Sequence, residues 1–366
     1  MLKEFVKEHR NNLPISTYHL CKEFNIPKNR VSNKSERDAI EKKNSNDYIY
    51  GDIHRSVVSP EKFVKTAVID VNFGVRNHEC FGLLGPNGAG KSTTLNMITA
   101  PQTMGSICYD GIEVHQVKLG KVSMGYCPQH DILWKELTLR EHLEFFLSIR
   151  GYNSKDAKFY ASQYINVAGL EEHRNKRIDN LSGGTKRKLS ILIAICGYPE
   201  RILLDEPTAG MDPSTRRLIW DIIMQTKRMN DSALILTTHS MEESEHLCDC
   251  LAKLVNGRLV CIGSPEHLKM KYGEGYILEL QTEDADQFHS QVVEGRDLFN
   301  SNYYEIEKTS NRRVEYKVKI TKSFGSVFEK MEEYKKKGLV KDYTFNQTSL
   351  EQIFINFAKK QIIQKN

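Results

Sequence analysis

Residues 85–92, GPNGAGKS, match the pattern GxxxxGK[ST], which is typical of a loop that wraps nucleotide phosphates. The segment follows an apolar run and precedes a helical stretch that starts near Thr93. Glycines let backbone N–H groups approach a β-phosphate, and the helix N-terminus adds partial positive charge. We expect Lys91 to reach the β- and γ-phosphates and the Ser92 hydroxyl to bind Mg²⁺. The residues assigned to this phosphate site are Gly85, Pro86, Asn87, Gly88, Ala89, Gly90, Lys91, Ser92 and Thr93.

Two carboxylates end a second apolar run, at 202–204. We expect Asp205 to hold Mg²⁺ through water, and Glu206 to polarise the water that attacks the γ-phosphate. A strand that ends in Asp-Glu is common by itself. Here it lies downstream of the phosphate loop and is followed by PTAGMD at 207–212, which favours the catalytic interpretation.

Two further polar residues follow apolar runs: Gln129 after 122–127 and His239 after 233–238. A single histidine at such a place is more often an ordinary loop or core residue. The carboxyl ends of parallel strands, however, meet at the edge where open α/β sheets bind ligands. The strand ends that carry Lys/Ser, Gln, Asp/Glu and His therefore predict a single nucleotide site.

A second candidate anion site is the segment Leu181-Ser182-Gly183-Gly184-Thr185, which precedes a helical stretch at 186–195. Exposed amides at a helix N-terminus bind anions. Because the phosphate loop occupies its own site, we expect this segment to serve a nucleotide held by another subunit.

The elements that must position these residues alternate between strand and helix, which predicts a mostly parallel sheet with crossover connections. A capping box, Thr138-x-x-Glu141, begins a helical stretch from 138 to about 180. After Gly275 the pattern changes to strand, helix, strand, strand, helix, strand, which is the ferredoxin-like order. Its predicted elements are 276–280, 285–299, 303–306, 314–320, 324–337 and 339–345.

A last predicted helix begins with the capping box Ser349-x-x-Gln352. Its apolar face consists of Leu350, Ile353, Phe354 and Phe357. We expect this face to dock on a neighbouring domain, with attachment to a membrane surface as the alternative.

The chain has 366 residues, of which 39% are hydrophobic, and a formal net charge of +5. This length predicts about two or three domains, and the mild charge does not imply nucleic acid. No apolar run approaches the ~18–20 residues of a membrane-spanning helix, and no N-terminal signal peptide is evident. We therefore expect that the chain does not cross a bilayer by itself.

Cysteines and basic residues suggest further expectations. The eight cysteines lack the CxxC spacing of a zinc site, so we expect reduced, buried thiols of a cytosolic protein. Basic residues gather before Asn44, so residues 1–45 are expected to form a polar linker, or else a segment next to anionic lipid headgroups.

These motifs together resemble the nucleotide-binding domain of an ATP-binding cassette (ABC) transporter. In the family's order they are the phosphate loop at 85–92, Gln129, the signature at 181–185, the pair at 205–206, Asp212 of the D-loop and the switch histidine His239. Further stretches at 80–87, 126–131, 254–264, 271–276 and 347–358 resemble the A subfamily of lipid exporters.

The resemblance implies a P-loop NTPase fold, in which a RecA-like α/β core carries an antiparallel β-lobe and a helical lobe at about 130–182. A regulatory, small α+β ferredoxin-like domain would follow. The expected boundaries are 1–45 for the linker, 46–270 for the nucleotide-binding domain, 271–348 for the regulatory domain and 349–366 for the C-terminal helix.

The family also implies roles for the site residues. ATP and Mg²⁺ would be bound, with Ser92, Gln129 and Asp205 as metal ligands and Glu206, His239, Gln129 and Lys91 as the catalytic set. An aromatic residue would stack on adenine, with Phe63 preferred and Tyr50 as the alternative. Two departures from the family pattern are Thr185, where glutamine is usual, and Arg201, which is expected just outside the sheet.

The implied function is hydrolysis of ATP by two cassettes that close head-to-tail. Hydrolysis would drive transmembrane domains that are not in this chain, at the cytoplasmic face of a membrane. The transported substrate would be lipid, which this domain would not bind. The alternatives are a soluble ABC-type ATPase and a nucleotide-dependent regulator without turnover. Intact Lys91, Asp205, Glu206 and His239 argue against a regulator without turnover.

Overall fold

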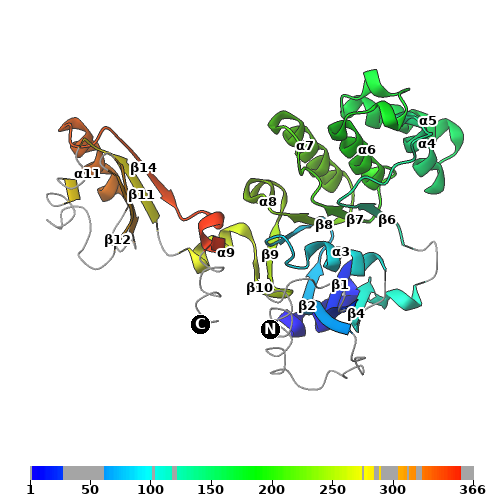
Figure 1. Cartoon of the computed structure of the whole chain (residues 1–366), viewed down its shortest axis with the longest axis horizontal. Coiled ribbons are helices and arrows are strands. Elements are labelled where there is room, and N and C mark those ends of the chain that lie inside the picture. The colour runs from blue at the N-terminus through cyan, green and yellow to red at the C-terminus, as the bar shows by residue number, and fades with distance from the viewer. Residues whose placement is uncertain are drawn as a thin grey trace. The chain divides into compact units, whose positions relative to one another are not determined.

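A computed structural model describes residues 2–27, 62–100, 104–117, 122–273, 276–283, 288–289, 304–310, 313–318 and 324–355. The chain divides into two compact units, Met1–Gly263 and Ser264–Asn366, which we call the first and second units (Figure 1). The described residues form three sheets, with strand orders β2-β1-β4-β5, β10-β9-β3-β8-β7-β6 and β12-β13-β11-β14.

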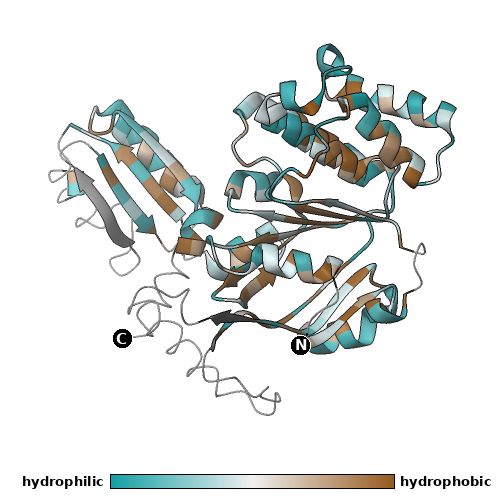
Figure 2. Ribbon diagram, turned by 45° about the vertical axis from the view of Figure 1, so that its right-hand side comes forward, coloured by the Kyte–Doolittle hydropathy of each residue, from teal (hydrophilic) through white to brown (hydrophobic). Residues whose placement is uncertain are grey.

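The central sheet of the first unit is mostly parallel. Its strands are β3 (Cys80–Leu84), β6 (Met124–Cys127), β7 (Arg201–Asp205), β8 (Ala233–Thr238), β9 (Cys250–Val255) and β10 (Arg258–Gly263), of which only β10 pairs antiparallel. Every residue of β3, β7 and β8 is buried, as expected for parallel strands with both faces covered. Figure 2 shows hydrophobic residues along these central strands. The predicted parallel core is confirmed.

Helices cover both faces of this sheet. They are α3 (Lys91–Thr99), α6 (Gly183–Ile195), α7 (Pro213–Met229) and α8 (Met241–Leu247). Helix α3 lies on one side, and α6, α7 and α8 lie on the other (Figure 1). Helices α3, α7 and α8 begin at or just after the predicted motifs that follow β3, β7 and β8, so these helix starts lie at the edge where the three strands end.

The antiparallel lobe is built from α1 (Leu2–His9), β1 (Ile15–Pro27), β2 (Lys62–Val75), β4 (Met104–Tyr109) and β5 (Ile112–Glu113). It packs on the central sheet through Phe73 and Phe81, whose ring centroids are 4.7 Å apart. The expectation of a linker over residues 1–45 is wrong for residues 2–27. Ile15 and Leu20 are fully buried in β1. The polar residues around them lower the average hydrophobicity of the segment, so its composition does not reveal the strand.

Arg201 begins β7, and its side chain is 2% exposed, so its expected position outside the sheet is also wrong. Its guanidinium donates to the Pro14 carbonyl oxygen at 2.8 Å and pairs with the carboxylates of Glu200 and Asp110. Because its charge and N–H groups find partners, burial of this arginine is tolerated. It joins the antiparallel lobe to the central sheet.

The predicted helical lobe is also confirmed, as α4 (Leu139–Ile149) and α5 (Ser154–Val167). The capping box that begins α4 is present. The Thr138 hydroxyl accepts the Glu141 backbone N–H at 3.3 Å, and the Glu141 carboxylate accepts the Thr138 N–H at 2.7 Å.

The second unit contains α9 (Pro265–Tyr272), β11 (Tyr276–Gln281), β12 (Tyr304–Ser310), β13 (Arg313–Val318), α11 (Phe324–Lys336) and β14 (Asp342–Gln347). Neighbouring strands are all antiparallel, and the order β12-β13-β11-β14 is that of a ferredoxin-like sheet. Leu278, Leu280 and Tyr316 pack with Met331 of α11 to form its core. Of the helix expected at 285–299, only 288–289 are described, and Phe288 joins this core.

The expected C-terminal helix is described over 350–355, where Leu350, Ile353 and Phe354 are buried. The Ser349 hydroxyl accepts the Gln352 backbone N–H at 3.2 Å, as a helix cap does. Phe357 lies outside the described residues, and docking of this helix on another domain stays a prediction.

All eight cysteines are free thiols, and all but Cys250 are buried. Among the residues that the structure describes, no helix combines the length and apolar character needed to cross a membrane.

Candidate nucleotide-binding site

The phosphate loop connects β3 to α3, and its glycines are required by close packing. Gly90 has φ 104° and directly precedes α3. A Cβ on Gly90 would lie 2.6 Å from the Ala67 carbonyl oxygen, and one on Gly85 would lie 2.4 Å from that of Leu254. Any larger residue would displace backbone of β2 or β9, so the loop conformation depends on these glycines.

Lys91 is held in place by the loop that it follows. Its side chain is 5% exposed, and its Nζ donates to the Gly85 carbonyl oxygen at 2.8 Å. The same Nζ lies 3.5 Å from Oε1 of Glu206. The ammonium group is therefore positioned between the phosphate loop and the carboxylate pair.

Asp205 and Ser92 form the predicted metal-binding edge. The Ser92 hydroxyl donates to Oδ1 of Asp205 at 3.1 Å, and the Thr237 hydroxyl donates to the same oxygen. Asp205 is 1% exposed. Mg²⁺ prefers oxygen ligands and usually combines one or two carboxylates with substrate phosphates, and this donor set fits that preference.

Glu206 has an unusual backbone conformation, with φ 47°. Residues other than glycine rarely adopt such values, at a cost of roughly 1–3 kcal/mol. The backbone N–H of Glu206 donates to both the carbonyl and the hydroxyl oxygen of Thr237, at 3.1 and 3.0 Å. These bonds to β8 hold the strained residue at the end of β7.

Three of the predicted residues converge on the Glu206 carboxylate. Lys91 approaches Oε1, while Nε2 of Gln129 and Nδ1 of His239 lie 3.5 and 3.7 Å from Oε2. Glu206 is 8% exposed, whereas the His239 side chain is 61% exposed and faces solvent. The structure thus brings the four strand ends together around one carboxylate.

The signature segment lies at the start of α6, away from these contacts. The Ser182 hydroxyl accepts the Thr185 N–H at 3.2 Å. Gly183 and Gly184 are exposed, and nothing lies within 4 Å of a Cβ added to either. Among the described residues, the polar groups on Glu206 do not come from this segment. Its shape leaves room for a ligand from outside the chain.

Asp212 precedes α7 and caps it. Hydrogen bonds from the Ser214 hydroxyl and then from the Thr215 N–H hold the pKa of the Asp212 carboxyl well below its usual range. Its carboxylate is therefore ionised at neutral pH, at a helix N-terminus that stabilises negative charge.

Arg187 is a site residue that the sequence did not single out. Its guanidinium is 6% exposed and lies between the Gln129 loop and the carboxylate pair. It donates to the carbonyl oxygens of Pro128, Gln129, Asp205, Glu206 and Pro207, and to the Asp131 carboxylate at 3.2 Å. The sequence offered little signal, because Arg187 stands between two other basic residues, Lys186 and Lys188, at the start of the helical stretch 186–195.

Phe24 is an aromatic candidate that the sequence analysis did not consider, because it lies in the expected linker. Tyr50 lies outside the described residues, and for Phe63 the structure describes only the backbone, which pairs with Ile26. Phe24 is 44% exposed and pairs with Lys65 of β2. Two residues further along β2, the Ala67 carbonyl passes next to Gly90. Phe24 thus offers an exposed aromatic ring on β1, the strand paired with the part of β2 that passes the phosphate loop.

Comparison with known proteins agrees with this geometry. The family model described as ABC transporter matches residues 68–209. Human ATP-binding cassette sub-family A member 2 is 42% identical over 301 residues, which cover 81% of this chain and 12% of that protein. Human retinal-specific phospholipid-transporting ATPase ABCA4 is 39% identical over 301 residues, which cover 79% of this chain and 13% of that protein. The chain therefore spans only 12–13% of the length of these relatives.

Two solved structures share the fold. The dimeric structure of a bacterial ABC transporter cassette has a TM-score of 0.55 at 20% identity, over 68% of this chain and 98% of that one. An ATP-binding subunit of an ABC transporter has a TM-score of 0.54 at 22% identity, over 70% of this chain and 92% of that one. The chain belongs to the ABC transporter family and carries a nucleotide-binding domain of its A subfamily.

Proposed function

We propose that this chain binds ATP with Mg²⁺ and hydrolyses it to power transport through transmembrane domains. The observation that carries the proposal is the convergence of Lys91, Gln129 and His239 on the buried Glu206 carboxylate, next to a phosphate-binding loop. A fold alone does not establish an activity, whereas this arrangement of charges supplies the parts that phosphoryl transfer requires.

Each group has a distinct task in this proposal. Loop amides, the N-terminus of α3 and the Lys91 ammonium bind the phosphates and balance their negative charge. Ser92, Asp205 and Gln129 would hold Mg²⁺, which neutralises charge on the phosphate oxygens when it is bound. Glu206 orients the attacking water and accepts its proton, and His239 steadies the Glu206 carboxylate and the γ-phosphate. Positioning and charge thus account for most of the catalysis.

A second cassette completes the site. Ser182, Gly183 and Gly184 are exposed at the start of α6, where backbone amides favour an anion. We assign them to the γ-phosphate of ATP bound to a partner cassette, with the two domains arranged head-to-tail and Asp212 near the shared interface. The dimeric form of the similar bacterial cassette supports this assembly.

The relatives support a proposal for the transported substrate. One of them is named a phospholipid-transporting ATPase, so lipid is the proposed substrate, bound by transmembrane domains rather than by this cassette. The cassette would lie at the cytoplasmic face of the membrane, and the second unit would act as a regulatory domain. For adenine, Phe24 replaces Phe63 and Tyr50 as the proposed stacking residue.

The test is a steady-state ATPase assay of the full chain at rising protein concentration. If two cassettes share each site, the rate per molecule rises with concentration. The variant Gly184→Asp is accommodated within its own chain but places a carboxylate against the partner's phosphates, so its rate should stay low at every concentration. Gly325→Asp is the matched control, because this exposed glycine of α11 also has nothing within 4 Å of an added Cβ. A Gly184→Asp variant as active as wild type would refute the shared site, and absence of hydrolysis in wild type would favour a regulator.

A further inference from the structure

A buried carboxylate, Glu243, connects the two loops that carry Glu206 and His239. Glu243 is 1% exposed and lies in the first turn of α8, four residues after His239. Its Oε1 accepts the hydroxyl of Thr208 at 2.6 Å, and Thr208 lies two residues after Glu206. A single carboxylate oxygen therefore joins the loop after β7 to the helix after β8.

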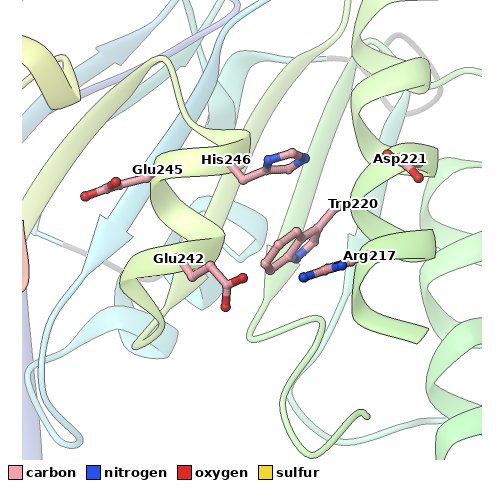
Figure 3. Close-up of a pocket in the computed structure, with 6 residues that line it drawn as sticks. All are labelled: Arg217, Trp220, Asp221, Glu242, Glu245 and His246. Carbon is pink, nitrogen blue, oxygen red and sulfur yellow. The ribbon is translucent and has the colours of Figure 1, made fainter. Parts of the chain in front are cut away.

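A second donor comes from α7. The indole Nε1 of Trp220 donates to the same Oε1 at 3.1 Å, and Trp220 is 4% exposed. The indole projects from α7 toward α8 and lies beside His246, with ring centroids 5.0 Å apart (Figure 3). A pocket between the two helices is lined by Arg217, Trp220, Asp221, Glu242, Glu245 and His246 (Figure 3).

Hydrogen bonds connect both loops to the points that Glu243 holds. On one side, the Ala209 N–H donates to the Glu206 carbonyl at 3.2 Å, so Thr208 sits within a turn that begins at Glu206. On the other side, the Ser240 hydroxyl accepts the Glu243 N–H at 3.3 Å, next to His239. Displacement of Thr208 relative to Glu243 would therefore displace Glu206 relative to His239.

Because Glu243 is buried, its carboxylate depends on the hydrogen bonds that it accepts. A carboxylate removed from water is costly unless it is hydrogen-bonded, and its two donors come from neutral side chains on separate elements. Its place in the first turn of α8 favours the negative charge. Loss of either donor would leave the buried carboxylate less well satisfied, so the bonds favour the observed positions of the elements that supply them.

We propose that Glu243 is a positioning residue for ATP hydrolysis, which keeps Glu206 and His239 at their 3.7 Å separation through Thr208. The inference rests on the proposed function, because it assigns Glu206 and His239 to the hydrolytic step. Glu243 itself lies behind the site and contacts neither the phosphate loop residues nor Glu206 among the contacts that the structure describes.

The test removes the connection with little change in shape. Thr208→Val replaces the hydroxyl by a methyl group of similar size, and Thr208→Ser retains the hydroxyl. In the full chain we expect Thr208→Val to lower kcat about tenfold, which corresponds to about 1.4 kcal/mol, with KM for ATP unchanged. Thr208→Ser should restore kcat to within about twofold of wild type. Glu242→Gln is the matched control on α8, since Glu242 is exposed, and it should leave kcat unchanged.

Trp220 provides an independent signal, because the chain has only two tryptophans. In a Trp134→Phe background, Glu243→Gln should shift the emission of Trp220, while Glu172→Gln, at an exposed position after α5, should not. Because both changes break one connection, kcat of the double variant Thr208→Val/Glu243→Gln should be close to that of the more impaired single variant. Three results would overturn the positioning role of Glu243. They are fully additive losses of kcat in the double variant, a loss of kcat in Thr208→Ser as large as that in Thr208→Val, and a rise in KM for ATP in parallel with the loss of kcat. Hydrolysis by wild type with an unimpaired Thr208→Val would overturn this inference alone, whereas an inactive wild type would overturn the proposed function as well.

Discussion

The central sheet of the first unit and the sheet of the second unit place their polar residues differently. Strands β3, β7 and β8 are buried throughout, and the polar groups of the site lie at or beyond their carboxyl ends, as Asp205 and Glu206 do at β7. Strand β11 instead alternates, with Leu278 and Leu280 buried and Glu279 exposed between them. A sheet covered on both faces concentrates chemistry at one edge, whereas a sheet with one open face distributes its charges over that face.

The largest effect should separate these two sheets. Lys91→Ala removes the ammonium group that the phosphate loop holds, and we expect ATPase activity to fall by about 100-fold or more. Lys335→Ala is the control in the second unit, where Lys335 forms an exposed ion pair with Asp342 at 3.1 Å. Steady-state hydrolysis measured on both variants checks the contrast. An equal loss of ATPase activity in the two variants would show that the charge next to the phosphate loop is no more important for hydrolysis than a charge in the second unit.

Next in size is the effect of Arg187, which joins the loops at that edge. Arg187→Met leaves the carbonyl oxygens of the site without their donor, and should lower the free energy of unfolding by about 3 kcal/mol. The neighbouring Lys188→Met, at a partly exposed position of the same helix, should change it by less than about 0.5 kcal/mol. Urea denaturation measures both values. A similarly small change in the free energy of unfolding of both variants would show that Arg187 does not hold the loops of the site together.

A smaller effect depends on pH. His142 is fully buried, with Nδ1 2.9 Å from the Thr138 carbonyl oxygen and Nε2 accepting the Trp134 N–H at 3.0 Å. Burial lowers the pKa of this imidazole below its ordinary value of 6.5. The unfolded chain then binds the proton more readily, so the free energy of unfolding should decrease as the pH falls below about 6.5.

Urea denaturation at pH 7.5 and at pH 5 checks this dependence. His142→Gln should reduce the difference between the two pH values, because it removes the titrating group but retains an amide that can donate and accept. A variant with the full wild-type pH dependence would show that another group is responsible.

The smallest effect concerns the nucleotide base. Loss of one stacking interaction in Phe24→Ala should raise the dissociation constant for ATP about fivefold, equivalent to about 1 kcal/mol. Phe328→Ala is a matched control in the second unit, because both side chains are 44% exposed. Equilibrium binding of a fluorescent ATP analogue compares the two. An unchanged affinity in Phe24→Ala would return the assignment to Phe63 or Tyr50.

Local spacing was enough to predict the parallel strands, the capping box at Thr138 and the ferredoxin-like order of the strands along the chain. Each of these depends on residues that are close together in the sequence. Strand β1 was missed because Ile15 and Leu20 are separated by polar residues, two of which, Ser16 and Thr17, are themselves buried.

The supporting contacts of the site could not be predicted from local spacing. Arg201 bonds to a carbonyl 187 residues away, and Thr208 and Glu243 are 35 residues apart. Such pairs become visible only when the strand order is known. The sequence motifs therefore located the groups at the strand ends, while the structure was needed to show what holds them there.

The most direct test of the account is ATP binding and hydrolysis by Glu206→Gln in the full chain. The amide keeps the size of the side chain but cannot accept the proton of the attacking water. We predict ATP affinity close to that of wild type, a stabilised closed dimer and turnover reduced by about 100-fold or more. A hydrolysis rate equal to that of wild type would remove Glu206 from its proposed role and contradict the account.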